Sequence, residues 1–477
     1  MKDVSENNET LTPEIVVIGG GPGGYEAALV AAHTGANVTL IEEHGVGGSA
    51  VLTDVVPSKT LIASADLMGR ITEGAQLGIT LGEPHEDTAI NVDFQLVNER
   101  LRNLVKQQSR DIRTGLESAG VTVIEGRGRL IDNTTVEVTD STGATQQISA
   151  TYILLAVGCH PRELPTAAPD GKRILNWTQL YQLDEVPEEL IVVGSGVTGA
   201  EFASAYNGLG SKVTLISSRD RVLPGEDEDA ASTLERVFAR RGVTVMARSR
   251  AEGARYTDSG DGVIVSLSDG TEVRGSHVLI AVGSIPNTEN LGLEAAGVHV
   301  QDSGHIKVDR VSRTSVHNIY AAGDCTGVFP LASVAAKQGR TAVAHMLGDT
   351  VRPLRVHKVA ANIFTSPEIA NVGISEADIA EGKVQAESAM ISLPTNPRAK
   401  MMSVQDGFIK IFSRKDSGTV LGGVVVGPRA SELIYPLTLA VDRKITVDEM
   451  ADTFTIYPSL SGSIAEVARR LHHTTED

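Results

Sequence analysis

The sequence predicts an α/β protein in which two similar βαβ units precede an α+β C-terminal domain. Three observations support this prediction. A glycine-rich turn follows an apolar strand at 19–24 and again at 194–199. A second pair of segments repeats as well, YILLAVG at 152–158 and HVLIAVG at 277–283. From about residue 351 these motifs stop. Strand-like segments at 408–413 and 421–426 alternate with helix-like segments at 431–442 and 464–471, which is typical of an α+β domain.

Each unit has the same order of elements, namely an apolar strand, the glycine-rich turn, a helix and a second strand. In the first unit the strands cover 14–19 and 38–41 and the helix 25–33; in the second unit they cover 190–193 and 213–216, and the helix 200–209. A single turn of this kind is weak evidence, because glycine-rich turns often have purely structural causes. Two copies, each between an apolar strand and a helix, indicate two dinucleotide sites.

The three glycines of each turn have separate physical roles. The first makes the tight bend, the second lets the backbone approach a pyrophosphate, and the third allows close packing of helix on strand. The helix that follows offers unpaired N–H groups to the anion. These residues are Gly19, Gly21 and Gly24 in the first unit, and Gly194, Gly196 and Gly199 in the second.

The residues after the second strand distinguish the two sites. Glu42 ends the first unit, where a carboxylate suits the two hydroxyls of a ribose. The second unit has Ser217, Ser218 and Arg219 at this place, and no acid before Asp220. The missing carboxylate removes repulsion against a 2′-phosphate, and an arginine can pair with one. The second site is therefore predicted to prefer NADPH, although two serines also fit the use of NADH.

Length and charge limit the class of protein. The 477 residues correspond to about three domains of ordinary size. The net charge is 42 − 60 = −18, which argues against nucleic acid or an anionic membrane as the main partner. No apolar run reaches the ~18 residues of a spanning helix, so no integral membrane segment is expected.

The N-terminus and the cysteines predict a cytoplasmic protein. Residues 1–10 are polar and contain no apolar signal-peptide core. The two cysteines, Cys159 and Cys325, lie in different motifs and are interpreted as reduced thiols. Neither a CxxC pair nor another metal-ligand spacing occurs, and no metal site is expected.

The motifs together resemble the flavoprotein pyridine nucleotide-disulfide oxidoreductases, a family that includes dihydrolipoyl dehydrogenase and glutathione reductase. The resemblance covers nearly the whole chain and rests on GGGPGG at 19–24, GSGVTGAEF at 194–202, AVGSIPN at 281–287 and TSVHNIYAAGD at 314–324. The segments AVL, VPSK and YPSLSGSI resemble in particular the dihydrolipoyl dehydrogenase-like NAD(P)H quinone reductases of actinobacteria, which lack the redox disulfide.

The resemblance implies a domain plan and a homodimer. It implies two Rossmann-like domains, one for FAD (1–157 and 283–350) and one for NAD(P)H (158–282), followed by a dimerisation domain (351–477). Asp324 would hydrogen-bond the ribityl chain of FAD, and Lys59 would pair with Glu201 beside the flavin. The resemblance also places further residues at the cofactors, namely Gly47, Gly48, Ser49, Gly128, Gly158, Gly283 and Ala332.

Four departures from the family pattern concern its chemistry. In the family a stretch like 47–59 contains two redox cysteines, and here these positions are Ala50 and Val55. The family's histidine base is replaced by Tyr457, and the glutamate partner of that base by Gly462. Disulfide exchange requires an attacking thiolate, a second sulfur and a base to move the proton. We therefore expect no disulfide reductase activity.

The expected function is that of an FAD-dependent NAD(P)H dehydrogenase that passes electrons from NADPH to a quinone-like acceptor. A cation at Lys59 would stabilise the reduced flavin. Tyr457 would either donate a hydrogen bond to the quinone or pack at the subunit interface. Two alternatives remain open at this point, a pyridine-nucleotide transhydrogenase and a non-catalytic flavoprotein that acts as a subunit or redox sensor.

Overall fold

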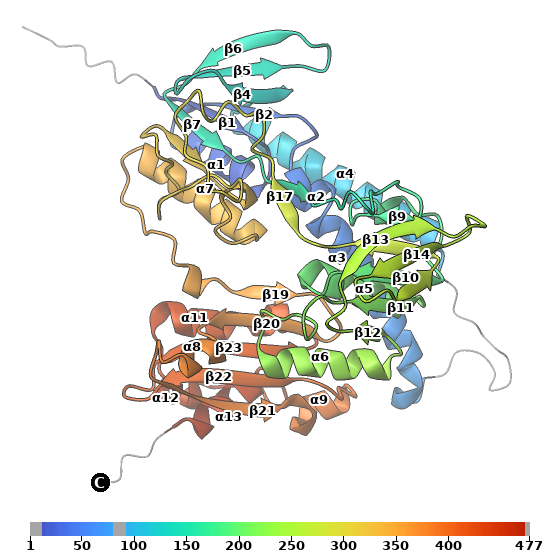
Figure 1. The fold of residues 1–477 in the computed structure, drawn as a ribbon. Helices are drawn as coiled ribbons and strands as arrows, with labels where there is room; N and C mark the ends of the chain where they lie inside the picture. The colour runs from blue at the N-terminus through green and yellow to red at the C-terminus, as the bar shows by residue number, and fades with distance from the viewer. Residues whose placement is uncertain (1–11, 80–91, 473–477) are drawn as a thin grey trace, which may run out of the picture. The chain divides into compact units, whose positions relative to one another are not determined.

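The structure is a computed structural model that describes residues 12–79 and 92–472. The chain forms two compact units, the first built from residues 1–56, 102–160 and 284–355, and the second from 57–101, 161–283 and 356–477 (Figure 1). Residues 1–10, whose composition predicts the lack of a signal peptide, lie outside the described residues. The domain boundaries inferred from the sequence stay a prediction.

The first unit is built on a parallel five-stranded sheet with the strand order β18-β7-β1-β2-β3. Its strands are β1 (Glu14–Ile18), β2 (Asn37–Glu42), β3 (Thr122–Glu125), β7 (Tyr152–Leu155) and β18 (Ile319–Ala321). The sheet therefore contains β1, which precedes the first glycine-rich turn, and β7, which belongs to the segment 152–158 that is repeated at 277–283.

Both faces of this sheet are covered. Successive side chains of a strand point to opposite faces, and those of β1 enter two different cores. Ile15 and Val17 pack with the helices α1 (Pro22–His33) and α7 (Ala332–Met346). Val16 and Ile18 pack against a three-stranded antiparallel sheet of β4 (Arg127–Leu130), β5 (Thr135–Thr139) and β6 (Thr145–Ser149). Figure 1 shows the parallel sheet between these two layers.

The second unit contains a parallel sheet with the order β12-β11-β10-β16-β9. Its strands are β9 (Ile174–Leu175), β10 (Glu189–Val193), β11 (Lys212–Ile216), β12 (Thr244–Met246) and β16 (His277–Ile280). The helices α5 (Val197–Gly208) and α6 (Glu228–Arg240) follow β10 and β11. A three-stranded antiparallel sheet of β13 (Ala251–Tyr256), β14 (Val263–Leu267) and β15 (Glu272–Gly275) shares a core with the parallel one.

The C-terminal part of the second unit is a five-stranded antiparallel sheet, in the order β19-β20-β23-β22-β21. Its strands are β19 (Ala361–Ile363), β20 (Glu368–Gly373), β21 (Ala386–Ser392), β22 (Phe408–Arg414) and β23 (Val420–Gly427). One face forms a core with α10 (Ala430–Leu433), α11 (Tyr435–Arg443), α12 (Val447–Asp452) and α13 (Gly462–Arg470).

The helices differ from the sequence prediction at their ends. α1 and α5 begin directly after the second glycine of their turns, at Pro22 and Val197, and so three residues earlier than expected. The helix expected over 431–442 is two helices, α10 and α11. Pro436 lies in the first turn of α11 and has no N–H to donate to an earlier carbonyl, which favours the start of a new helix there.

The remaining elements connect these layers. Within residues 12–79 and 92–472 they are α2 (Gly48–Leu52), α3 (Val55–Thr72), α4 (Phe94–Ser118), α8 (Glu376–Ala380), α9 (Pro397–Met401), β8 (Cys159–Pro161), β17 (Ser284–Pro286) and short 3₁₀ helices at Gly74–Leu77, Leu180–Gln182, Asp324–Thr326, Val356–Lys358 and Leu393–Thr395. Among the described residues, no helix has both the length and the hydropathy needed to span a membrane.

Candidate active site

The first glycine-rich turn has a backbone that only glycine tolerates at two of its positions. Gly19 has φ +102°, and a Cβ there would lie 2.3 Å from the Ala156 carbonyl oxygen. A Cβ on Gly24 would lie 1.9 Å from the carbonyl oxygen of Gly19. At Gly21, in contrast, the nearest atom to a Cβ is 3.9 Å away. The turn is therefore tightly packed toward the protein and open at its second glycine, which fits the approach of a pyrophosphate.

Glu42 is held at the end of β2, next to this turn. One carboxylate oxygen accepts a hydrogen bond from the Gly20 N–H at 2.6 Å. The other accepts from the N–H groups of His44, at 2.8 Å, and Gly45, at 3.3 Å. These bonds fix the carboxylate where the βαβ unit would place the ribose of a dinucleotide.

A second glycine-rich segment lies against the turn. The Gly47 N–H donates to the carbonyl oxygen of Gly20 at 2.8 Å. Gly48 approaches so closely that a Cβ would lie 2.7 Å from the Cα of Gly21. The exposed Ser49 follows in α2. The segment 47–49, which was assigned to the cofactor by resemblance, is thus brought to the turn by the fold.

Asp324 provides a partly buried acceptor in the same unit. Burial raises the pKa of its carboxyl group, and the nearby His305 works against this shift. Within the described residues no hydrogen bond is donated to this carboxylate. A partly buried acceptor without a donor fits a ligand hydroxyl group such as those of a ribityl chain.

Three further predicted cofactor residues of the first unit have different environments. Gly158 has φ +65° and follows β7, while Ala332 is the first residue of α7. Gly128 lies in β4, where a Cβ would be 3.0 Å from the Cγ2 of Ile18. Close packing against β1 accounts for this glycine without a ligand. The part of all three residues in FAD binding stays a prediction.

The second glycine-rich turn has the same geometry as the first. Gly194 has φ +115°, and a Cβ there would lie 2.1 Å from the carbonyl oxygen of Ala281. A Cβ on Gly199 would lie 1.9 Å from the carbonyl oxygen of Gly194. Around Gly196, the N-cap of α5, no atom lies within 4 Å of an added Cβ. Gly283, with φ +100°, follows β16.

The structure corrects one expectation at the nucleotide ribose. Ser217 is fully buried, and its hydroxyl lies 2.7 Å from that of Ser195 and accepts the Arg219 N–H at 3.1 Å. Because these bonds occupy the side chain inside the protein, Ser217 shapes the turn and does not present its hydroxyl to a ligand. Ser218 and Arg219 are exposed and remain candidates for contact with a 2′-phosphate.

Arg248 is a candidate that the sequence analysis missed. Its N–H donates to the carbonyl oxygen of Arg219 at 2.7 Å, because β12 pairs with β11 and the chain continues alongside it. Both arginines are exposed, and among the described residues neither guanidinium has an ion-pair partner. The run Arg-Ser-Arg at 248–250 is visible in the sequence, but only the order of the strands brings it beside Arg219.

The predicted pair of Lys59 and Glu201 is formed. The Lys59 Nζ lies 2.7 Å from Glu201 Oε2, and the carboxylate side chain is only 5% exposed. The other oxygen, Oε1, accepts the Phe364 N–H at 2.8 Å, and the ring of Phe364 lies 4.9 Å from Nζ. Three segments that are distant in the sequence, namely α3, α5 and the residue directly after β19, therefore hold one ammonium group in place.

The comparisons with known proteins agree with this geometry. The family model described as pyridine nucleotide-disulphide oxidoreductase matches residues 13–339, and the dimerisation domain of the same family matches 359–468. The chain belongs to this family. Its fold is accordingly the expected one, with two Rossmann-like domains and a C-terminal dimerisation domain, and its cofactors are FAD and NAD(P)H.

The similar proteins extend over nearly the whole chain. One is the NAD(P)H dehydrogenase (quinone) of Mycobacterium tuberculosis strain H37Rv, 51% identical, with 97% of this chain and 94% of the relative covered. Another is the dihydrolipoyl dehydrogenase of Geobacillus stearothermophilus, 33% identical, with 96% of each covered. The crystal structure of LpdA from M. tuberculosis superposes with a TM-score of 0.92 at 50% identity, covering 97% of this chain and all of that one.

In this oxidoreductase the positions of the missing dithiol are occupied by apolar side chains. Ala50 lies partly buried in α2, and Val55, 37% exposed, begins α3 one helical turn before Lys59. The two cysteines do not replace the dithiol. Burial, followed by the charge of Asp324, raises the pKa of Cys159 to about 12, and burial raises that of Cys325 to about 12. Both thiols therefore stay protonated near neutral pH.

The substituted base positions lie just before α13 and at its first residue, in the dimerisation domain. Tyr457 is 83% exposed, and its neighbours Phe454 and Ile456 are 102% and 80% exposed. Gly462 is the first residue of α13. The dimerisation domain supports a homodimer, and an exposed apolar segment of this kind is typical of a subunit interface.

Proposed function

We propose that the protein oxidises NADPH and transfers the electrons through FAD to a quinone, without disulfide reductase activity. The main support is a combination of three features. Both dinucleotide turns are intact, Lys59 pairs with Glu201, and apolar residues occupy both positions of the redox cysteines. The 51% identical relative is named NAD(P)H dehydrogenase (quinone), which supports the same function. We also propose a homodimer in the cytoplasm, consistent with two free cysteines.

The residues have the following proposed roles. FAD would be held by the turn at Gly19–Gly24, by Glu42 and by Asp324, and when bound it supplies the hydride acceptance and onward electron transfer. NADPH would be held by the turn at Gly194–Gly199, with Arg219 and Arg248 at the 2′-phosphate. Lys59, fixed by Glu201, would stabilise the negative charge of the reduced cofactor.

Steady-state oxidation of NADPH separates the possible functions. A quinone should give rapid turnover, while an oxidised nicotinamide analogue and a sample without acceptor should give little. Preference for the nicotinamide analogue over the quinone would instead identify a transhydrogenase. Loss of NADPH oxidation with every acceptor, in protein that binds FAD, would identify a non-catalytic flavoprotein. Anaerobic reduction of the flavin by NADPH provides the reference for all three measurements.

The position of the acceptor can be tested at Val55. Because the side chain is 37% exposed, Val55→Trp enlarges a surface residue and leaves the buried cores unchanged. We expect quinone reduction to be blocked while anaerobic flavin reduction by NADPH stays fast. The matched control Val55→Ala should keep both half-reactions. Undiminished quinone turnover in Val55→Trp would show that the acceptor does not bind next to Val55.

The role of Tyr457 is tested by removing only its hydroxyl group. If the phenol donates a hydrogen bond to the quinone, Tyr457→Phe should lower quinone turnover by about 10-fold, which corresponds to about 1.4 kcal/mol. Packing at the interface would be unaffected by this substitution, and turnover would then equal that of the unaltered protein. The oligomeric state, measured by light scattering, should be the same in both proteins.

A further inference from the structure

The loop that bears Arg219 connects β11 to α6 and runs from Ser217 to Asp227. Its first residue is fixed by the hydrogen bond between the hydroxyls of Ser217 and Ser195. In the middle, the Leu223 N–H donates to the carbonyl oxygen of Ser195 at 2.8 Å. The loop therefore rests on the second glycine-rich turn at its first residue and in its middle, and Arg219 lies between these two contacts.

The far end of the loop is held by the C-terminal sheet. Glu226 accepts a hydrogen bond from the side-chain amide of Asn371, in β20, at 2.6 Å. Asp227, the N-cap of α6, forms an ion pair with Lys410, in β22, at 2.9 Å. The last two residues of the loop are thus bound to two strands that lie more than 140 residues further along the chain.

Lys410 is a buried cation with three acidic partners. Its neighbours Ile409 and Ile411 enter the core with α10–α13, so the alternation of β22 turns Lys410 to the opposite face, toward α6. Its ammonium also contacts Asp229 at 2.6 Å and Glu376 at 2.8 Å, and the side chain is 3% exposed. Burial works to lower the pKa of Lys410, but hydrogen bonds to the three carboxylates outweigh it and raise the pKa.

We propose that Lys410 and Asn371 are positioning residues for the nicotinamide nucleotide, which set the preference for a 2′-phosphate by fixing the loop that bears Arg219. The inference rests on the proposed use of NADPH. An arginine on a loop whose backbone is already held loses less conformational entropy on binding, whereas a loop released at one end must be ordered first. The C-terminal sheet, which belongs to the dimerisation domain, would thus control nucleotide selectivity.

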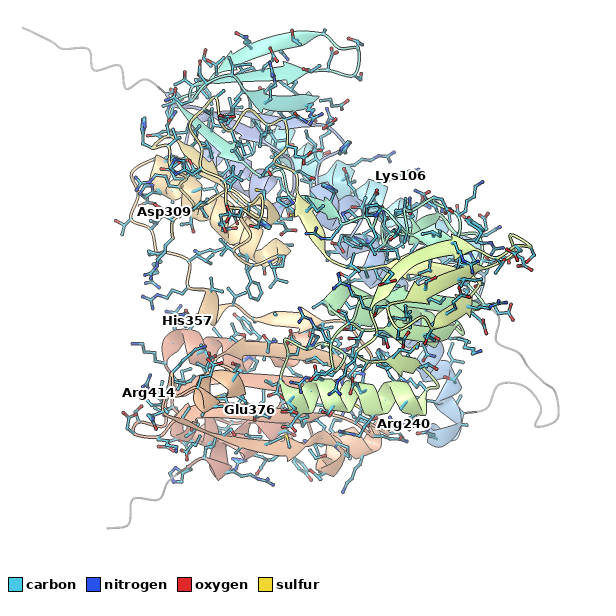
Figure 2. All side chains as sticks on the ribbon, viewed as in Figure 1. Lys106, Arg240, Asp309, His357, Glu376 and Arg414 are labelled. Carbon is cyan, nitrogen blue, oxygen red and sulfur yellow. The ribbon has the colours of Figure 1, made fainter. Side chains whose placement is uncertain are left out.

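A second ion pair between the same helix and the same sheet provides a matched control. Arg240, the last residue of α6, pairs with Asp406 ahead of β22. Asp229 and Arg240 are eleven positions apart, about 16 Å along the helix axis. Figure 2 labels Arg240 at the end of α6 and Glu376, the α8 partner of Lys410, near the start of α6. Arg240→Ala therefore weakens the contact of helix and sheet without touching the loop.

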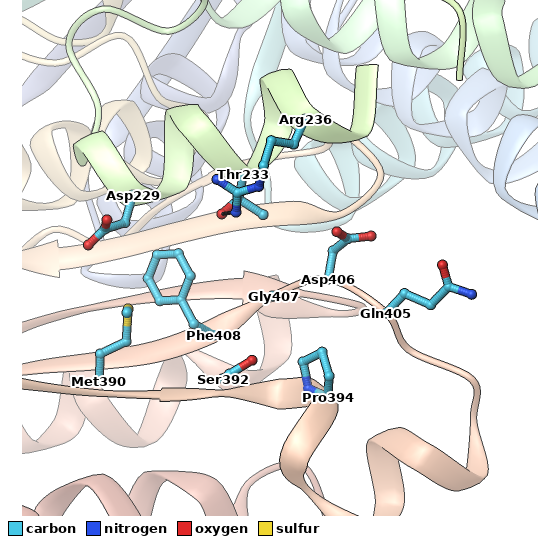
Figure 3. A pocket seen from close by; sticks show the side chains of 10 residues that line it. All are labelled: Asp229, Thr233, Arg236, Met390, Ser392, Pro394, Gln405, Asp406, Gly407 and Phe408. Atoms are coloured by element: carbon cyan, nitrogen blue, oxygen red, sulfur yellow. Dashed lines mark hydrogen bonds between the residues drawn. The ribbon is translucent and has the colours of Figure 1, made fainter. Parts of the chain in front are cut away.

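A cavity of about 190 Å³ separates the two contacts. It lies between α6 and the strands β21 and β22, with Asp229 at one end and Asp406 toward the other (Figure 3). Because this space divides the two ion pairs, substitution at one end is expected to leave the other in place. The control and the test variants thus probe different parts of one interface.

The test measures binding to the holoenzyme, with 2′,5′-ADP as the probe for the 2′-phosphate and 5′-AMP as the probe without it, by isothermal titration calorimetry. Lys410→Met and Asn371→Leu should each weaken 2′,5′-ADP binding by about 5- to 20-fold and 5′-AMP binding by less than about 2-fold. Lys410→Arg keeps the charge and should restore most of the affinity. Arg240→Ala should alter neither ligand.

The outcomes separate this inference from the proposed function. Equal weakening of both ligands in the test variants, or no weakening, would overturn the positioning role. If Lys410→Met does not yield folded protein, Asn371→Leu decides alone, because it removes one hydrogen bond and no charge. An unaltered protein that binds both ligands equally would instead refute the preference for NADPH. Loss of preference in Arg219→Ala but not in Asn371→Leu or Lys410→Met would refute only the role of the sheet.

Discussion

The open space beside Gly196 allows nucleotide binding to be separated from folding. Gly196 has φ −73° and ψ −172°, an extended conformation that alanine adopts readily, and no atom lies within 4 Å of an added Cβ. We therefore expect Gly196→Ala to fold normally. Lower freedom of the unfolded chain stabilises such a variant by about 0.4–1 kcal/mol. Alanine at an N-cap costs a similar ~0.5–1 kcal/mol, so the two effects nearly cancel.

Nucleotide binding should suffer in the same variant. The added methyl group occupies the space through which a pyrophosphate reaches the N–H groups of α5. Loss of one charge-assisted hydrogen bond corresponds to about 1.5–3 kcal/mol, or about 10- to 150-fold in Kd. Gly199→Ala is the contrasting variant, because its Cβ would lie 1.9 Å from the carbonyl oxygen of Gly194 and the strand–helix packing would have to shift.

Two measurements check this prediction. Thermal unfolding should give Gly196→Ala the same midpoint as the unaltered protein, within a few degrees, and a clearly lower midpoint for Gly199→Ala. Anaerobic titration with NADPH should show the loss of affinity in Gly196→Ala, whereas the FAD content stays equimolar. An undiminished affinity for NADPH in a folded Gly196→Ala protein would falsify the assignment of this turn to the nicotinamide nucleotide.

Four further predictions follow from single features of the chain. Arg219→Ala should raise the KM for NADPH about 10-fold and leave the KM for NADH nearly unchanged. The effect lies at the low end of the range for a charge-assisted hydrogen bond, because this arginine is exposed and screened by solvent. An equal change in both KM values would contradict this prediction. Lipoamide and glutathione disulfide should not be reduced, and cysteines introduced at Ala50 and Val55 should not restore full turnover, because the base is still missing. The measurement is NADPH oxidation that depends on the added disulfide, and rapid oxidation in the unaltered protein would contradict this prediction. Burial lowers the pKa of His277 from its ordinary 6.5 to about 4, so the folded protein binds the proton less well than the unfolded chain. The stability should therefore fall as the pH drops from 6.5 toward 4, and His277→Gln should make this fall smaller in acid unfolding curves. Deletion of residues 450–477 should abolish the dimer and acceptor reduction together, and light scattering that shows an active monomer would argue against a shared site.

Local features of the chain predicted the nucleotide turns and the limits of the chemistry. The spacing of Gly19, Gly21 and Gly24 predicts the first turn because its geometry depends on which neighbouring residues lack a Cβ, and this is a property of a few consecutive positions. Ala50 and Val55 likewise exclude a redox dithiol at these two positions, because the fold cannot supply a sulfur atom that the side chains lack. The pairing of Lys59 with Glu201 was predicted only through the family resemblance.

Only the tertiary structure decided which polar side chains around the second site face solvent and which are held inside. Ser217 was expected at the cofactor, but its hydroxyl is used by Ser195, which is 22 residues away in the sequence. Arg248 reaches Arg219 because β12 pairs with β11, and Lys410 reaches Asp227 from another sheet. Each of these contacts joins segments that no periodicity relates. Their existence depends on the order of the strands and the packing of the layers, which a sequence pattern does not contain.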